Sequence, residues 1–104
     1  MKVAIIEDEP LAVEKLEKFL LRHDPDIEIM ARLTKVQDAV KWLGQHQQEL
    51  DLIFMDIQLI DGISFDIFNQ VEIKRPVIFI TAFDEYAIDA FKVNSIDYIL
   101  KPIS

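Results

Sequence analysis

The sequence has 104 residues, of which 51% are hydrophobic and 29% charged, the balance of one globular domain rather than of a disordered chain. Its formal net charge of −8 argues against direct binding of nucleic acid or an anionic membrane by this segment, because phosphate groups would be repelled. Two glycines cannot supply the loops of Rossmann or P-loop nucleotide sites, and the lack of cysteine excludes disulfides, zinc–thiolate sites and iron–sulfur clusters.

Short apolar runs alternate along the chain with amphipathic stretches of helical length. Val3 to Ile6 is a continuous apolar run that ends in acidic residues, as expected of a strand buried on both faces. Pro10 then fits the first position of a helix, where a missing N–H costs nothing. In the first half of the chain we predict a strand at 3–6, a helix at 10–22, a strand at 27–31, a helix at about 35–48 and a strand at 52–55. Next comes a helix indicated by Ile63, Ile67, Phe68 and Val71, followed by a strand at 77–80. The last two predicted elements are a helix at 84–93, with Tyr86, Ala90 and Phe91 on one side, and a strand at 96–100.

This alternation of strands and helices predicts an α/β fold. Nearly continuous apolar strands between helices indicate a five-stranded parallel sheet with helices on both faces. Because crossovers between parallel strands are right-handed, the sheet should be doubly wound. In such sheets ligands bind beyond the carboxyl ends of the strands, so that edge is where functional residues are expected.

Polar residues follow the predicted strands in a regular way. Glu7 and Asp8 follow the first strand, Asp56 the third, Thr81 the fourth and Lys101 the fifth. In a parallel sheet these strand ends lie at one edge. We therefore expect three carboxylates, one hydroxyl and one ammonium group to share a single site.

The chemistry of this residue set points to a divalent cation and a phosphoryl group. Three clustered carboxylates repel one another, and a hard cation such as Mg²⁺, which prefers oxygen ligands, relieves that repulsion. Lys101 could neutralise a phosphoryl oxygen, and Thr81 could donate a hydrogen bond to another. Asp56, alone at the end of the central strand, is the best candidate for a carboxylate nucleophile.

These motifs together resemble the receiver domain of two-component response regulators, and the resemblance covers the whole chain. The motifs are Glu7-Asp8 after the first strand, Asp56 in Asp-Leu-Ile-Phe-Met-Asp-Ile, Thr81-Ala82 after the fourth strand and Lys101-Pro102 after the fifth. More narrowly, the stretch from Ala90 to Ile103 is similar to receivers that precede a LytTR-type (LytR/AlgR-like) DNA-binding domain. The resemblance implies a flavodoxin-like sheet with strand order 2-1-3-4-5.

The resemblance implies that Asp56 is the phosphorylation site and takes its phosphoryl group from a sensor histidine kinase in a Mg²⁺-dependent reaction. Asp8 and Asp56 would bind the metal directly, with the backbone carbonyl of Gln58 as a third protein ligand. Glu7 stands where Asp is commoner in the family. Its role would be through a metal-bound water, so the additional methylene should be tolerated.

The resemblance also implies which residues respond to phosphorylation. Lys101 would pair with the phosphoryl group, and Thr81 would move toward a phosphoryl oxygen. Tyr98, three residues before Lys101, would turn inward into the vacated space, and the last helix and strand would form the output face. The domain would then be a phosphoryl acceptor that controls transcription through an attached domain, with at most slow autodephosphorylation as enzymatic activity.

One segment departs from the family pattern. Many receivers carry Met-Pro and a longer loop after the acceptor, whereas here Ile57 to Ile60 leads directly to Asp61-Gly62. The loop is shortened, with Ile60 where proline is often found. We expect this change to affect loop rigidity and the dephosphorylation rate and to leave Asp56 untouched.

Two other classes of function share part of this pattern. A pseudo-receiver is an interaction module that never carries phosphate, and the presence of every acceptor-site residue argues against it. An aspartate-nucleophile phosphohydrolase would share the Mg²⁺ and the aspartate. That class places its nucleophile after the first strand within Asp-x-Asp, which Glu7-Asp8-Glu9 does not match.

The extent of the chain suggests a receiver without its last helix. The fifth predicted strand ends near Leu100, and a sheet covered on both faces needs a fifth helix after it. We therefore expect the native protein to continue past Ser104 with that helix and a LytTR-like DNA-binding domain. The uncovered face would favour self-association, including a homodimer. No apolar run reaches the roughly 18 residues needed to span a membrane, so we expect a cytoplasmic domain without membrane contact.

Overall fold

The computed structural model describes residues 1–93 and 95–103. In chain order its elements are β1 (Lys2–Ile6), α1 (Pro10–His23), β2 (Glu28–Leu33), α2 (Val36–His46), a 3-10 turn (Gln47–Glu49), β3 (Leu52–Met55), β4 (Gln58–Leu59), β5 (Gly62–Ile63), α3 (Phe65–Gln70), β6 (Val77–Thr81), α4 (Ala87–Lys92) and β7 (Asp97–Leu100). None of the helices within these residues combines the length and the apolar composition that crossing a membrane requires.

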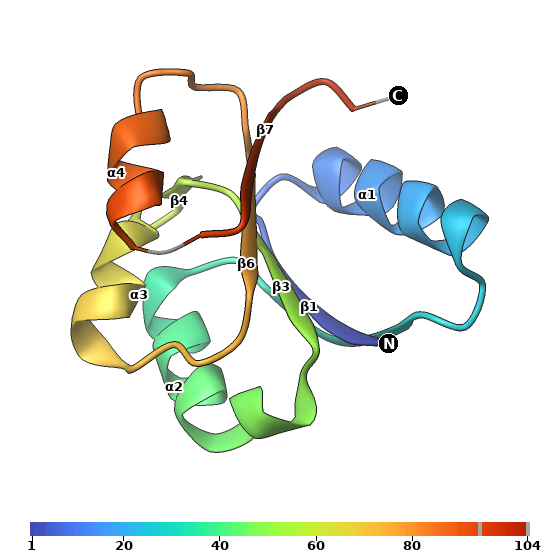
Figure 1. Cartoon of the computed structure of the whole chain (residues 1–104), viewed down its shortest axis with the longest axis horizontal. Helices are drawn as coiled ribbons and strands as arrows, with labels where there is room; N and C mark the ends of the chain where they lie inside the picture. Colours follow the sequence, from blue (N-terminus) through green and yellow to red (C-terminus); the bar gives the residue numbers. More distant parts are fainter. Residues whose placement is uncertain (94, 104) are drawn as a thin grey trace.

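Five strands form one parallel sheet in the order β2-β1-β3-β6-β7. Since β6 and β7 are the fourth and fifth strands of the prediction, the expected order 2-1-3-4-5 and the doubly wound, flavodoxin-like fold are confirmed. Figure 1 shows α1 on one side of the sheet and α2, α3 and α4 on the other. The strands β4 and β5 form a separate antiparallel hairpin directly after β3.

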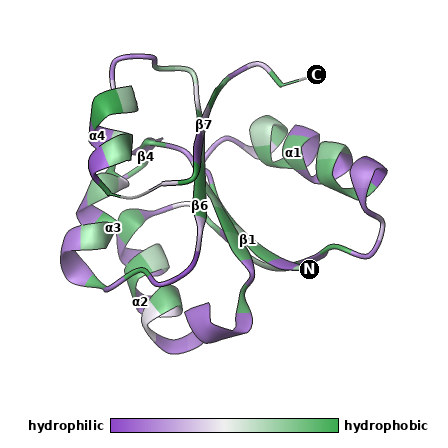
Figure 2. Cartoon of the chain, in the orientation of Figure 1, coloured by the Kyte–Doolittle hydropathy of each residue, from purple (hydrophilic) through white to green (hydrophobic). Residues whose placement is uncertain are grey.

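Alternate residues of the central strands face the two sides of the sheet. In β1, Ala4 and Ile6 belong to the apolar cluster that includes α2 and α3, whereas Val3 and Ile5 belong to the cluster that includes α1. All four side chains are buried, which is why the strand reads as a continuous apolar run. Figure 2 shows this hydrophobic centre, with β1 and β6 in the hydrophobic colour and the turns around them more hydrophilic.

The hairpin corrects the prediction that Ile63 belongs to the third helix. Gln58 and Leu59 pair with Ile63 and Gly62, and α3 begins only at Phe65. Gly62 has a φ of +153°, a conformation that favours glycine and does not occur inside an α-helix. The shortened loop therefore closes as a hairpin, and Ile63 is left 38% exposed.

The fourth helix is also shorter than the predicted 84–93, and one of its residues is placed differently. Ala90 is buried and Tyr86 is half-buried, but Phe91 is 82% exposed. Residues four apart, such as Tyr86 and Ala90, share a helix face, whereas the next residue points about 100° away. The prediction that Phe91 packs on the same side was therefore wrong.

Candidate functional site

The charged residues of the site follow the strands through backbone hydrogen bonds that continue the sheet ladder. The N–H of Glu7 donates to Leu33 O at 2.9 Å, and that of Asp56 donates to Ile6 O at 2.8 Å. The N–H of Lys101 donates to Thr81 O at 2.8 Å. Because the backbone is fixed one residue beyond each strand, the three side chains emerge at the same sheet edge.

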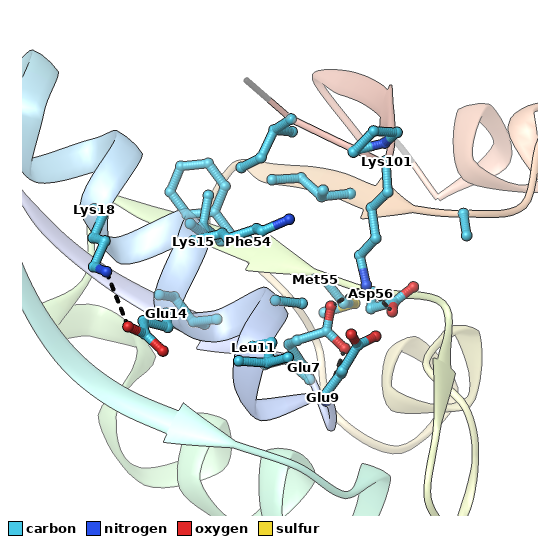
Figure 3. Close-up of a pocket in the computed structure, with 18 residues that line it drawn as sticks. Glu7, Glu9, Leu11, Glu14, Lys15, Lys18, Phe54, Met55, Asp56 and Lys101 are labelled. Atoms are coloured by element: carbon cyan, nitrogen blue, oxygen red, sulfur yellow. Dashed lines mark hydrogen bonds and ion pairs between the residues drawn. The ribbon is translucent and has the colours of Figure 1, made fainter.

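Lys101 lies between two of the predicted carboxylates, although it is 94 residues from Glu7 and 45 from Asp56 in sequence. Its Nζ donates to Glu7 Oε1 at 2.5 Å and to Asp56 Oδ2 at 3.0 Å. Asp56 Oδ1 also accepts the N–H of Ile57 at 2.6 Å. Figure 3 shows the Lys101 side chain extending from the C-terminal strand to these two carboxylates.

The three carboxylates can be tested as a metal site from their own geometry. Glu7, Asp8 and Asp56 each offer an oxygen, and these oxygens lie within 4.8 Å of one another. Glu7 and Asp56 are buried and Asp8 is half-buried. Lys101 supplies one positive charge against three acidic groups. An all-oxygen set with excess negative charge fits a hard divalent cation such as Mg²⁺.

The electrostatics of the cluster show the same excess of acidic groups. Burial raises the pKa of Glu7 to about 7, and the neighbouring charge of Asp56 adds to the rise, while the hydrogen bond from Lys101 opposes it. Burial alone would lower the pKa of Lys101, but its hydrogen bonds to Glu7 and Asp56 raise it overall. Lys101 therefore remains an ammonium group.

Thr81 and Tyr98 are bonded to the turn after β6 rather than to the carboxylates. Thr81 is fully buried, and its Oγ1 accepts the N–H of Phe83 at 3.4 Å. The Tyr98 hydroxyl donates to the carbonyl of the same Phe83. The Tyr98 ring lies against Phe79, with centroids 6.3 Å apart. The two predicted switch residues therefore both bind the turn at Phe83, Thr81 through the backbone N–H and Tyr98 through the backbone carbonyl.

Gln58, the predicted backbone ligand, lies at the start of the hairpin, two residues after Asp56. Its side chain is directed elsewhere, because Nε2 donates to the hydroxyl of Tyr86 at 3.2 Å. The sequence analysis placed Tyr86 only on one side of the predicted helix at 84–93. No local pattern identifies this contact, since the two residues are 28 positions apart.

Asp61 is a second residue whose role the sequence analysis missed. Its carboxylate accepts the N–H groups of Val36 at 2.6 Å and Gln37 at 3.1 Å, and so caps α2 from the hairpin. Lys35, the residue before that helix, provides no side-chain cap. The Asp61-Gly62 pair is a hairpin signal that could have located the turn, though not the helix it caps.

A groove of about 530 Å³ begins at the carboxylate cluster and runs along α1. Its apolar lining comes from α1, the sheet and the segment after β7, and includes Leu16, Phe54, Ile80 and Ile103. Figure 3 shows Lys15, Lys18 and Glu14 of α1 along this groove. Lys18 and Glu14 form an ion pair of 3.0 Å.

Comparison with known proteins shows which family the chain resembles. A family model described as "Response regulator receiver domain" matches residues 3–104. The Sensory transduction protein LytT of Bacillus cereus is 42% identical over 105 residues, which cover 98% of this chain and 42% of that protein. The Transcriptional regulatory protein BtsR of Escherichia coli K12 is 42% identical over 106 residues, which cover 99% and 43% respectively. The chain thus spans less than half the length of these relatives.

Solved structures show the same architecture. The response regulatory domain of protein mrkE from Klebsiella pneumoniae has a TM-score of 0.79 and 36% identity, with 100% of this chain and 85% of that chain covered. A CheX–CheY–BeF3–Mg complex from Borrelia burgdorferi has a TM-score of 0.88 with 18% identity, covering 100% and 80%. At that identity the second match is evidence for the fold alone.

Proposed function

This chain belongs to the response regulator receiver domain family, and on that premise we propose that it is a phosphorylation-dependent switch with Asp56 as the phosphoryl acceptor. The observation that carries the proposal is the contact of Lys101 with both Glu7 and Asp56 beside the carboxylate of Asp8. Four groups from three strand ends converge there. A purely structural ion pair would need only one of the three acids.

The proposed donor is the phosphohistidine of a sensor histidine kinase. A carboxylate oxygen of Asp56 attacks the phosphorus atom, so that an O–P bond forms while the N–P bond breaks. The bonding electron pair returns to the imidazole nitrogen, which takes up a proton. Lys101 Nζ, 3.0 Å from Asp56 Oδ2, is positioned to pair with the incoming phosphoryl oxygens.

Asp8 and Asp56 are the proposed direct ligands of Mg²⁺, with the Gln58 carbonyl as a third ligand and Glu7 acting through a water. When bound, the ion neutralises negative charge on the transferred phosphoryl group. The residues around it contribute separately. Lys101 balances part of the carboxylate charge, and the hydrogen bond from the Ile57 N–H orients Asp56.

The proposed output begins at Phe83. A phosphoryl oxygen offers the Thr81 hydroxyl a charged acceptor, and the movement of Thr81 toward it lengthens the bond that Thr81 Oγ1 accepts from the Phe83 N–H. The Tyr98 hydroxyl, bonded to the Phe83 carbonyl, follows the rearranged turn. This biases α4 and β7, which would carry the signal to an attached DNA-binding domain that controls transcription.

We propose further that in the native protein a fifth helix after residue 104 covers the groove beside α1, and that a LytTR-like domain follows. Two observations support this extension: the groove has an apolar lining, and the relatives are more than twice as long as the aligned region. If no helix covers the groove, we expect two copies of the chain to form a homodimer through it. Light scattering of the 104-residue chain should then detect self-association, and a monomer at all concentrations would contradict this expectation.

Labelling with acetyl phosphate tests the acceptor directly. With Mg²⁺ present, the wild-type chain should gain one phosphoryl group by mass spectrometry, and Asp56→Asn should gain none. Asp26→Asn is a matched control, because Asp26 is an exposed aspartate that lies before β2, away from the site. Undiminished labelling of Asp56→Asn would contradict the assignment, and an unlabelled wild-type chain would favour the pseudo-receiver.

A further inference from the structure

Tyr86 connects the hairpin that follows the acceptor to the first turn of α4. Its hydroxyl accepts a hydrogen bond from Gln58 Nε2 at 3.2 Å. Its backbone carbonyl accepts the N–H of Ala90 at 2.9 Å, the bond that starts the helix. A displacement of Gln58 is therefore passed through one side chain to the position where α4 begins.

The hairpin on the other side of this contact is held firmly. The N–H of Ser64 donates to Ile57 O at 2.7 Å, which closes the segment around the hairpin. The carboxylate of Asp61 is bound to two N–H groups of α2. These bonds fix the backbone of the hairpin next to Asp56, and the exposed Gln58 side chain reaches Tyr86 from that fixed backbone.

The ring of Tyr86 is packed on aromatic side chains from both directions. Its centroid is 6.0 Å from that of Phe65 at the start of α3 and 6.2 Å from that of Phe83, the latter in an edge-on arrangement at 80°. Burial raises the pKa of Tyr98, and the backbone of Tyr86 opposes the rise. Tyr86 therefore contacts both the hairpin and the turn held by Thr81 and Tyr98.

The geometry points to Tyr86 as a positioning residue that couples occupancy of the site to the position of α4 through its hydrogen bond with Gln58. This inference rests on the proposed function and adds a connection that does not pass through Thr81. The helix that it positions exposes Ile88 and Phe91, at 72% and 82%, so a shift of the first turn changes an apolar surface.

Hydrogen exchange of the 104-residue chain tests this coupling. The amides of 84–93 are followed with Mg²⁺ and beryllofluoride and again without them, and the ratio of the two protection factors is compared between variants. Tyr86→Phe removes only the hydroxyl and should lower this ratio, by at most about fivefold, because the full effect of one ordinary hydrogen bond is the upper limit. Gln58→Ala should lower it as much, and the double variant should show no further loss, because both substitutions break one bond.

A merely structural role for Tyr86 would lower protection equally in both states and leave the ratio unchanged. Such an unchanged ratio in Tyr86→Phe, with Asp56 still labelled by acetyl phosphate, would overturn the coupling and leave the proposed function intact. Additive losses in the double variant would also overturn it. An unlabelled wild-type chain whose exchange does not respond to beryllofluoride would overturn the proposed function and the coupling together.

Discussion

The two faces of the sheet are built from the same strands but are covered to different extents. On the face toward α2, α3 and α4, Phe79 has no exposed surface, whereas on the face toward α1, Val3 and Ile5 are as well covered but Phe54 and Ile80, which border the groove, keep 6% and 7%. The difference arises from the covering helices, because Phe79 and Ile80 are neighbours in one strand. An apolar strand sequence therefore does not close a face by itself.

The two faces of the sheet are suited to different roles. The closed face holds a connected set of aromatic rings, from Tyr86 through Phe65 and Phe79 to Tyr98, which is suited to transmit a change between the hairpin and β7. The open face holds the groove, which is suited to receive a further segment. The carboxylate cluster lies at the edge that both faces share.

The largest expected effect on stability comes from replacing one phenylalanine by alanine on each face of the sheet. Phe79→Ala should lower the free energy of unfolding by about 3–5 kcal/mol, because it leaves a cavity in the closed cluster. Phe54→Ala should cost less than about 3 kcal/mol, because the side chain already borders the groove. Urea denaturation of both variants measures the difference. Equal costs would mean that the two faces are equally well packed.

Metal binding should stabilise the shared edge and neither face in particular. Mg²⁺ at 100 times its Kd should raise the free energy of unfolding by about 2.7 kcal/mol. Asp8→Asn removes one of the three carboxylates and should abolish most of this gain, while the exposed Asp26→Asn should retain it. Thermal unfolding with and without Mg²⁺ gives the comparison. If Asp8→Asn gained as much stability as the wild type, the cluster would not be the metal site.

Substitution of Ser64 tests whether an unsatisfied buried hydroxyl destabilises the closed face. Its Oγ is fully buried and has no hydrogen-bond partner within residues 1–93 and 95–103. Ser64→Ala should therefore raise stability by about 1 kcal/mol, since an unsatisfied buried hydroxyl is removed. Ser95→Ala is the matched control and should lower it by a similar amount, because Ser95 Oγ donates to Ala90 O at 2.9 Å. A loss of stability in both variants would contradict the interpretation that the Ser64 hydroxyl is unsatisfied.

The smallest effect concerns an ion pair on the open side. Arg32 binds both carboxylate oxygens of Glu17, at 2.6 and 2.7 Å, and this hydrogen bonding lowers the pKa of Glu17. Because Arg32 is half exposed, Glu17→Gln should cost no more than about 1 kcal/mol at pH 7. A lowered pKa in the folded state means that the contribution is present above the ordinary value of 4.5 and is lost as the pH falls below it.

Urea titrations of Glu17→Gln and the wild type at pH 7 and pH 3 check this dependence. Glu14→Gln is the control, since the Glu14–Lys18 pair is 57% and 69% exposed and should contribute less. A difference between Glu17→Gln and the wild type that stayed constant across this pH range would show that the effect is not electrostatic.

The sequence by itself determined the strands of the sheet and the edge at which the site lies. A strand such as β3, buried on both faces, needs an apolar residue at every position, and this requirement is visible in Leu52 to Met55 without knowledge of its neighbours. Because the strands run parallel, the residues that follow them, such as Asp56 and Lys101, lie at one edge of the sheet. The strands are predictable because each depends on burial within one segment, and the edge follows from their common direction.

Only the tertiary structure decided which side chains became partners. Asp61 caps a helix 25 residues earlier, and Gln58 reaches Tyr86 across 28 residues. β2 continues to Leu33, beyond the predicted 31, because Ile6 of β1 is there to pair with it. A local pattern records how much of a segment is buried, but a hydrogen bond depends on the distance between two segments, and that distance exists only once the chain has folded.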